Sequence, residues 1–242
     1  MPISRPISRR RFALACCLGM PLAAQRGGKQ TARDLFYAEA GLIVSSSDRG
    51  KGRFTAARKS VIAVTLGLKY RFWKVVSDQP QDWEPDGPFV HRDQVRLGVE
   101  VNDAGYLYVV RRLGSGMWQR MFPTPEIERG SHFVRNGVTY PIPPEEGLEL
   151  QFPGGSERLL LVLSRNPVKE LELLVGPRAP ENTVSAAPPP EVSSQVLDQV
   201  RNLLAPKDLL TERSAAERCV YVVNRSGRPD SVVAVEVRLA AR

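Results

Sequence analysis

The sequence predicts an all-β protein built around an antiparallel β-sandwich. Apolar and polar residues alternate with a period of two in several short segments, which is typical of strands with one buried face. Two other segments are almost entirely apolar, as expected for strands covered on both faces. Turn residues separate about seven such segments at intervals of roughly 8–15 residues, and this spacing is typical of a sandwich.

The first predicted strands span residues 66–72, 94–101 and 106–110. In the first of them the apolar residues fall on even positions, whereas Lys69 and Arg71 fall on odd positions. The second alternates without interruption, and the third is apolar throughout. The turn residues 102–105 lie between these last two strands and predict that they form an antiparallel hairpin. Residues 78–88 contain three prolines and are predicted to be a loop.

Further strands and one strong turn signal follow. Residues 117–122 form a predicted strand that ends at two prolines. Asn136-Gly137 is the typical sequence of a two-residue turn, and it predicts a hairpin between residues 132–135 and 138–140. Residues 148–152 alternate again, and residues 158–163 are predicted to be a second buried strand. Together the segments predict an immunoglobulin-like antiparallel β-sandwich over residues 61–175.

The flanking segments are interpreted from their composition. Residues 25–60 form an N-terminal segment whose apolar residues are expected to pack, and residues 176–191 contain five prolines, as is typical of a linker. Residues 192–242 are predicted to form a C-terminal helix and a β-hairpin that pack on the sandwich. The helix begins at Ser193 or Ser194 and ends before Pro206. The hairpin joins residues 220–223 to residues 232–239.

The first 24 residues have the pattern of a bacterial export signal. An apolar stretch over residues 12–24 follows a basic run. It is shorter than the about 20 residues that span a membrane, and it fits the core of a signal peptide. A paired arginine at this place is typical of the twin-arginine route, with a Sec signal as the alternative. We predict a twin-arginine-type signal peptide that is cut after Ala24, so that the mature chain is periplasmic or extracellular. The motif residues are Ser8, Arg9, Arg10 and Phe12.

The charge balance argues against a nucleic-acid partner. The chain has 34 basic and 26 acidic residues, which gives a net charge of +8. Residues 1–24 contain four arginines and no acidic residue, so the mature chain carries a net charge of only +4. Such a mixed surface differs from the basic footprint of a nucleic-acid-binding protein. No later stretch is apolar over about 18 residues, so no transmembrane anchor is expected in the mature chain.

No group of residues has the spacing of a catalytic, cofactor or metal site. His91 and His132 lie in different predicted segments, without a cysteine or paired carboxylate at ligand spacing. Asp103 is interpreted as a turn residue, and Ser164 has no obvious base. Once the leader is removed Cys219 is the only cysteine, and it is interpreted as a buried, small apolar residue. We therefore predict a protein that is not an enzyme and that holds no cofactor.

Two tryptophans define a candidate binding patch. Trp73 falls off the apolar phase of its strand, next to Arg71 on the polar face, so we expect it to be exposed. If Trp118 is exposed as well, the two indole rings form a contact patch for a protein or a glycan. The alternative for both side chains is burial in the core, where most such aromatic residues lie.

Several short motifs in the central region follow one another in a recognisable order. The most specific is Gly-Tyr-Leu-Tyr-Val at residues 105–109. The others are Val95-Arg96-Leu97, Asn102, Met121-Phe122-Pro123, Tyr140-Pro141-Ile142-Pro143, Gly155-Ser156-Glu157 and Leu163-Ser164. Through them the stretch 66–174 resembles the bacterial family called domain of unknown function 4384. The resemblance implies a small β-sandwich of binding or structural type in an exported or envelope protein, and it transfers no catalytic residues.

These observations favour an exported, non-enzymatic β-sandwich that acts as a protein-binding or structural module of the cell envelope. Its expected partner is another envelope protein, bound through a strand edge or an aromatic face. The alternative is a module that binds a glycan such as peptidoglycan through exposed aromatic residues. A third, weaker interpretation is a hydrolase whose site has no recognisable motif.

Overall fold

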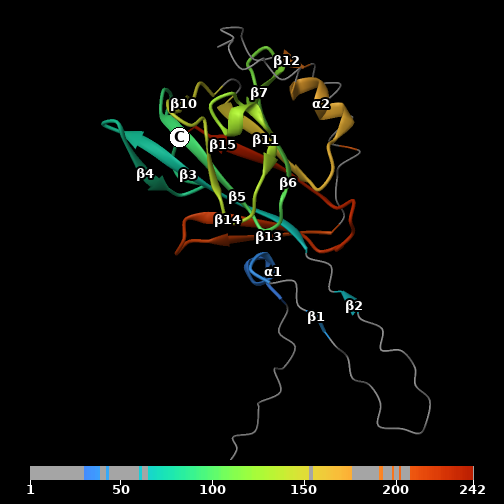
Figure 1. Ribbon diagram of the computed structural model, residues 1–242. Coiled ribbons are helices and arrows are strands. Elements are labelled where there is room, and N and C mark those ends of the chain that lie inside the picture. Colours follow the sequence, from blue (N-terminus) through green and yellow to red (C-terminus); the bar gives the residue numbers. More distant parts are fainter. Residues whose placement is uncertain are drawn as a thin grey trace, which may run out of the picture.

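The computed structural model describes residues 30–38, 42–43, 60–61, 65–152, 155–175, 191–192, 198, 202 and 208–241. The strands within these ranges form two antiparallel sheets that face each other (Figure 1), which confirms the predicted all-β sandwich. The predicted leader with Ser8, Arg9, Arg10, Phe12 and Ala24 lies outside the described residues. So do residues 176–190 of the predicted linker and nearly all of the predicted C-terminal helix.

The first sheet contains seven strands, and β3 and β5 form its centre. β3 pairs with β5 on one side and with β14 and β4 on the other, and β13 extends the sheet beyond β14. β9 and β10 both pair with the far side of β5. The strand bounds are β3 Leu66–Val76, β4 Gln79–Trp83, β5 Gln94–Val101, β9 Thr139–Ile142, β10 Leu148–Glu149, β13 Leu209–Ser214 and β14 Cys219–Asn224.

The second sheet contains six strands in the order β12-β7-β6-β11-β15, with β8 also paired to β6. A separate pair joins β1 (Leu42–Ile43) to β2 (Ser60–Val61). The helices are α1 (Ala32–Phe36), α2 (Lys169–Val175) and the short 3-10 helix η1 (Glu128–Gly130). The strand bounds of the second sheet are β6 Gly105–Arg112, β7 Trp118–Phe122, β8 Phe133–Val134, β11 Ser156–Ser164, β12 Glu191–Val192 and β15 Val232–Ala240.

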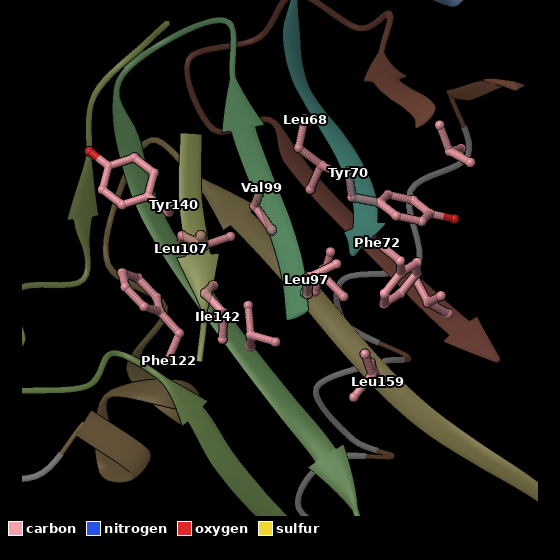
Figure 2. Packing of buried hydrophobic residues seen from close by; sticks show 14 of the residues in the cluster. Leu68, Tyr70, Phe72, Leu97, Val99, Leu107, Phe122, Tyr140, Ile142 and Leu159 are labelled. Carbon is pink, nitrogen blue, oxygen red and sulfur yellow. The ribbon is translucent and has the colours of Figure 1, made fainter. Parts of the chain in front are cut away.

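The main core lies between the two sheets and follows the predicted alternation. In β3 the side chains of Leu66, Leu68, Tyr70 and Phe72 are buried in it, and the residues between them point to the outer face. Figure 2 shows Leu68, Tyr70 and Phe72 beside Leu97 and Val99 of β5. Residues of the second sheet in the same core include Leu107 and Leu159. A period of two therefore places every second side chain of β3 in the core.

A second apolar cluster covers the outer face of the second sheet. Tyr108, Val110 and Trp118 pack there with Leu160 and Val162, beneath α2. α2 contributes Leu171, and Val168 comes from the loop before it. This cluster explains why β6 and β11 are apolar on both faces, as predicted. The sequence pattern did not indicate α2, which is the next element after β11.

Three predicted hairpins are wrong, and all three for the same reason. The strands of 94–101 and 105–112 lie in different sheets, and β8 and β9 on either side of Asn136-Gly137 do so as well. The predicted C-terminal hairpin is also divided, because β14 belongs to the first sheet and β15 to the second. Turn residues reverse the chain, but a reversed chain can enter the facing sheet as readily as pair with its neighbour.

Two segments have more strand than predicted. Residues 79–83 of the predicted loop form β4, which follows a turn at Ser77 and Asp78, both with positive φ (50° and 60°). Positive φ at both central residues is typical of the hairpin turn that matches the twist of a sheet. Pro80 is tolerated because β4 is an exposed strand at the margin of the sheet. β13 was also missed, and it forms the actual C-terminal hairpin with β14.

Candidate functional site

One half of the outer face of the first sheet is covered by α1. This five-residue helix begins with a capping box, in which the Thr31 hydroxyl accepts the Asp34 N–H (3.1 Å) and the Asp34 carboxylate accepts the Thr31 N–H (3.1 Å). Ala32 and Phe36 pack on Cys219, Tyr221 and Val223 of β14. The helix therefore closes this half of the face.

A polar network surrounds that apolar contact. The Tyr221 hydroxyl donates to Glu217 and lies 3.2 Å from the Tyr37 hydroxyl. Lys69 donates to Tyr37 (3.3 Å) and forms an ion pair with Glu100, and Arg33 forms an ion pair with Glu217 (2.7 Å). Burial, followed by the hydrogen bond to Glu217, raises the pKa of Tyr221 far above its usual range. The same hydrogen bond lowers the pKa of Glu217. Each carboxylate has a cationic partner, so the network holds α1 in place.

Cys219 lies under this network and is fully buried. Burial is the main cause that raises the pKa of its thiol above the ordinary value. Its Sγ is 3.8 Å from a Glu217 carboxylate oxygen. A buried thiol with a raised pKa is a poor nucleophile, and the predicted burial of Cys219 is confirmed.

The other half of the same face is open and contains a shallow hollow of about 310 Å³. Asp82, Trp73 and Arg96 lie directly opposite one another on the adjacent strands β4, β3 and β5. Two prolines, Pro80 of β4 and Pro141 of β9, complete the lining. The hollow therefore combines an aromatic ring, one acid, one base and two rigid apolar rings on four strands of one sheet.

A glycine positions the indole ring of Trp73. A Cβ atom at Gly98 of β5 would lie 2.4 Å from Cη2 and 2.6 Å from Cζ3 of Trp73. The ring therefore lies against bare backbone, in space that any other residue at position 98 would fill. Gly98 is opposite Pro141, which places the proline beside the same ring. As predicted, Trp73 is not part of the core, and it is half-buried.

The two charged residues of the hollow, Asp82 and Arg96, are not paired with each other. Asp82 is 4.0 Å from the Arg71 guanidinium, at the limit of an ion pair. Arg96 forms no ion pair with any residue that the structure describes, and its Nε is enclosed without an acceptor among them. The guanidinium is a planar donor suited to carboxylates. Arg96 is thus a lining group whose charge no described residue balances.

The predicted patch of Trp73 with Trp118 is wrong. Trp118 lies in β7 of the second sheet, is 2% exposed, and packs with Tyr108 and Leu160 in the cluster beneath α2. The two tryptophans therefore lie on different sheets, and only Trp73 reaches an open surface. The sequence alone did not reveal α2, which covers the outer face at Trp118.

The two histidines have different surroundings. His91 is exposed in a turn, whereas His132 lies 3.0 Å from Glu172, which also accepts the Tyr108 hydroxyl. The Val168 N–H donates to the same hydroxyl (3.1 Å). This cluster connects α2 to the second sheet. Within the described part of the chain, no group of three or more His, Cys, Asp or Glu side chains is arranged to hold a metal ion.

The two other residues weighed from the sequence have structural partners. Asp103 accepts a hydrogen bond from Arg165 (3.0 Å), which also donates to the backbone of Arg228 (2.8 Å), so three turns are held together. Ser164 is buried at the end of β11, and its hydroxyl accepts the Asn166 N–H (3.3 Å). Neither residue faces the hollow.

Comparison with known proteins identifies one family in part of the chain. Residues 89–167 match the family Domain of unknown function (DUF4384). The DUF4384 match is shorter than the resemblance over 66–174, and it begins just before β5 and ends after β11. It includes Arg96 and Pro141 of the hollow, whereas Trp73, Pro80 and Asp82 lie outside it. No curated protein and no solved structure matches the chain.

The sequence contained part of the signal for the hollow. The alternation of 94–101 puts Arg96 on the outer face with Gly98, just as the alternation of 66–72 puts Trp73 outside. Only the register of β4, β3, β5 and β9 brings these residues together. Among the helices that the structure describes, none is long and apolar enough to span a membrane.

Proposed function

We propose that this protein is an exported, non-enzymatic binding module that recognises a protein segment at the hollow around Trp73. The observation that supports it is the pairing of a half-buried indole ring with an unpaired guanidinium, on an open sheet face. Binding sites commonly combine an apolar contact with a few polar groups that orient the ligand. Tryptophan and arginine are also the residues most enriched among those that dominate binding energy.

The lining favours an acidic, extended segment. A carboxylate on the partner would pair with Arg96 and satisfy a cation that no described residue neutralises. A proline or other apolar side chain next to it would pack on Trp73 between Pro80 and Pro141. Asp82, directly across from Trp73, disfavours a second acidic group on that side. The ligand chemistry is thus a carboxylate adjacent to an apolar residue.

A glycan remains the second candidate, because sugars also stack on indole rings. The burial of Trp118 weakens the glycan hypothesis, because only the ring of Trp73 is left for a sugar to stack on. Peptidoglycan fragments therefore serve as a competing probe. A third probe, a generic ester or peptide substrate, tests for the hydrolase interpretation.

The binding test compares two hollow variants with a matched control. The fluorescence anisotropy of a labelled synthetic peptide that has a glutamate next to a proline is titrated with the protein, and peptidoglycan fragments are added separately as a competitor. Trp73→Ala and Arg96→Glu should each weaken peptide binding by about tenfold or more. Arg92→Glu, in an exposed turn outside the hollow, makes the same charge change and should bind like the wild type. Equal binding by all variants, or a preference for the glycan, contradicts the proposal.

The export part of the proposal rests on residues 1–24 and is tested separately. Lysine substitution at both Arg9 and Arg10 should retain the chain in the cytoplasm if it uses the twin-arginine route. Continued export of that double variant would indicate the Sec route. Retention of the unaltered chain in the cytoplasm would contradict export, without bearing on the hollow.

A further inference from the structure

A regular strand forms one edge of the second sheet. β15 pairs with β11 at nine consecutive positions, from Ser156 opposite Ala240 to Ser164 opposite Val232. Among the described strands, none pairs with its other side. At its two ends the Asn224 side chain donates to the Val232 carbonyl (2.7 Å) and Phe89 forms a parallel bridge with Ala241. The backbone N–H and C=O groups between these two positions are the ones that β15 presents.

Apart from the charges of Glu236 and Arg238, this edge lacks the features that usually block strand addition. β15 contains no proline and no glycine, and its register with β11 has no shift. Val233, Val237 and Leu239 are buried on its inner face, in the main core. Long, regular and apolar edges are normally covered, because they pair readily with other strands. The open part of β15 is therefore suited to pairing with a further strand.

The charges on β15 indicate what that strand is. Glu236 and Arg238 are two positions apart and share the outer face of the sheet, on the side where Ala234 packs beneath α2. Arg238 is exposed and forms no ion pair with a described residue. Instead it lies directly opposite Arg158 of β11, a like charge, while Glu236 is 3.5 Å from that same Arg158. The strand thus carries one acid and one base, of which the base lacks a partner.

We propose that β15 pairs antiparallel with β15 of a second copy of this chain, with Val237 on the two-fold axis. Residues whose numbers are equally far from 237 then lie opposite each other. Glu236 faces Arg238 of the partner subunit, and Arg238 faces Glu236 of the partner subunit. Both pairs lie on the outer face, and each Arg238 gains the carboxylate that it lacks.

Neighbouring registers do not give this match. A shift of one position would oppose inner-face to outer-face residues, which breaks the alternation of the sheet. A shift of two positions would bring either Glu236 or Arg238 opposite its own copy, and like charges directly opposite are destabilising. In the proposed register Val235 faces Leu239 of the partner subunit on the inner face. The second sheet of one subunit then joins the second sheet of the other in one continuous sheet with two-fold symmetry.

A charge exchange tests the proposal on the purified full chain. The molecular mass in solution is measured by light scattering over a wide range of protein concentration, and the wild type should dimerise. Glu236→Arg and Arg238→Glu each create two like-charge pairs and should raise the dimer dissociation constant by about tenfold or more. The double variant with both substitutions restores opposite charges and should restore the dimer. Arg225→Glu, in an exposed turn, is the matched control and should leave dimerisation unchanged.

A cross-link tests the register independently. In the proposed pairing Ala234 faces Ala240 of the partner subunit, so the double variant Ala234→Cys with Ala240→Cys should form intermolecular disulfides between positions 234 and 240. Mass spectrometry locates these disulfides, and neither single variant should form one between positions 234 and 240.

A wild type that is monomeric throughout, or a dimer that the charge variants do not affect, overturns the proposal. A monomeric wild type would favour coverage of β15 by another part of its own chain. The hollow lies on the other sheet, so peptide binding and dimerisation can fail separately.

Discussion

The indole ring of Trp73 occupies the space that a side chain at Gly98 would require. A Cβ atom at position 98 would come within 2.4 Å of Cη2 of the ring. The two residues lie on adjacent strands, with Trp73 opposite Arg96 and Gly98 two positions further along β5. The shape of the hollow therefore depends on the absence of a side chain.

Gly98→Ala should displace the ring and destabilise the fold by about 1–3 kcal/mol, as is typical when a methyl group is forced into a filled space. It should also alter the tryptophan fluorescence of the native protein. In a Trp73→Ala background the new methyl group has room, so the same substitution should cost less than about 1 kcal/mol. Urea unfolding of the four proteins in this cycle measures the difference. Equal costs in both backgrounds would show that the ring is not what excludes the methyl group.

The two tryptophans should respond differently to truncation. Trp118→Ala removes a ring that is 2% exposed beneath α2, so it should lower the free energy of unfolding by about 3–5 kcal/mol. Trp73→Ala removes a half-buried ring and should cost at most about 2 kcal/mol, while it weakens peptide binding. Unfolding curves and the fluorescence titration separate the two effects. A larger stability loss at Trp73 than at Trp118 would contradict the assignment of the two faces.

Glu157 should make the folded protein less stable as pH rises. Its side chain is 3% exposed, Oε2 has no hydrogen-bond partner, and Arg111 is 3.8 Å away. Burial raises the pKa of this carboxyl, and Arg111 only partly offsets it. Because the folded state binds the proton more tightly than the unfolded chain, stability is lost as pH rises through the raised pKa.

Glu157→Gln removes this titration. Its stability relative to the wild type should therefore increase as pH rises from about 4 to about 7. Urea unfolding across that range measures the trend, with Glu146→Gln in an exposed loop as the control. A relative stability that falls with pH would mean that attraction to Arg111 outweighs the cost of burial.

Glu217 should show the opposite dependence on pH. The hydrogen bond from Tyr221 lowers its pKa, with further lowering by the charges of Arg33 and Lys69. This stabilisation is present above the ordinary carboxyl pKa and is lost as pH falls through the lowered value. Glu217→Gln should therefore be less stable than the wild type at neutral pH, and the difference should shrink in acid. Tyr221→Phe should raise the Glu217 pKa, which carboxyl NMR detects, and an unchanged pKa would exclude the hydrogen bond as its cause.

The sequence by itself determined which residues face the core and which strands are covered twice. A period of two in 66–72 and 94–101, and its loss in 106–110 and 158–163, record burial directly, because side chains alternate across a sheet. The position of Trp73 outside the core follows from the same local pattern, whereas the burial of Cys219 was expected from its residue type. No information from distant parts of the chain was needed for these predictions.

Only the tertiary structure decided which strands pair. The turns at 102–105, at Asn136-Gly137 and after β14 reverse the chain, yet each leads into the facing sheet, because turn chemistry fixes local backbone angles and not the next partner. The burial of Trp118 depends on α2, and the hollow depends on the register of four strands from distant parts of the chain. Which strands pair and which sheet faces are covered depend on contacts across the whole sandwich. No short segment of the sequence specifies those contacts.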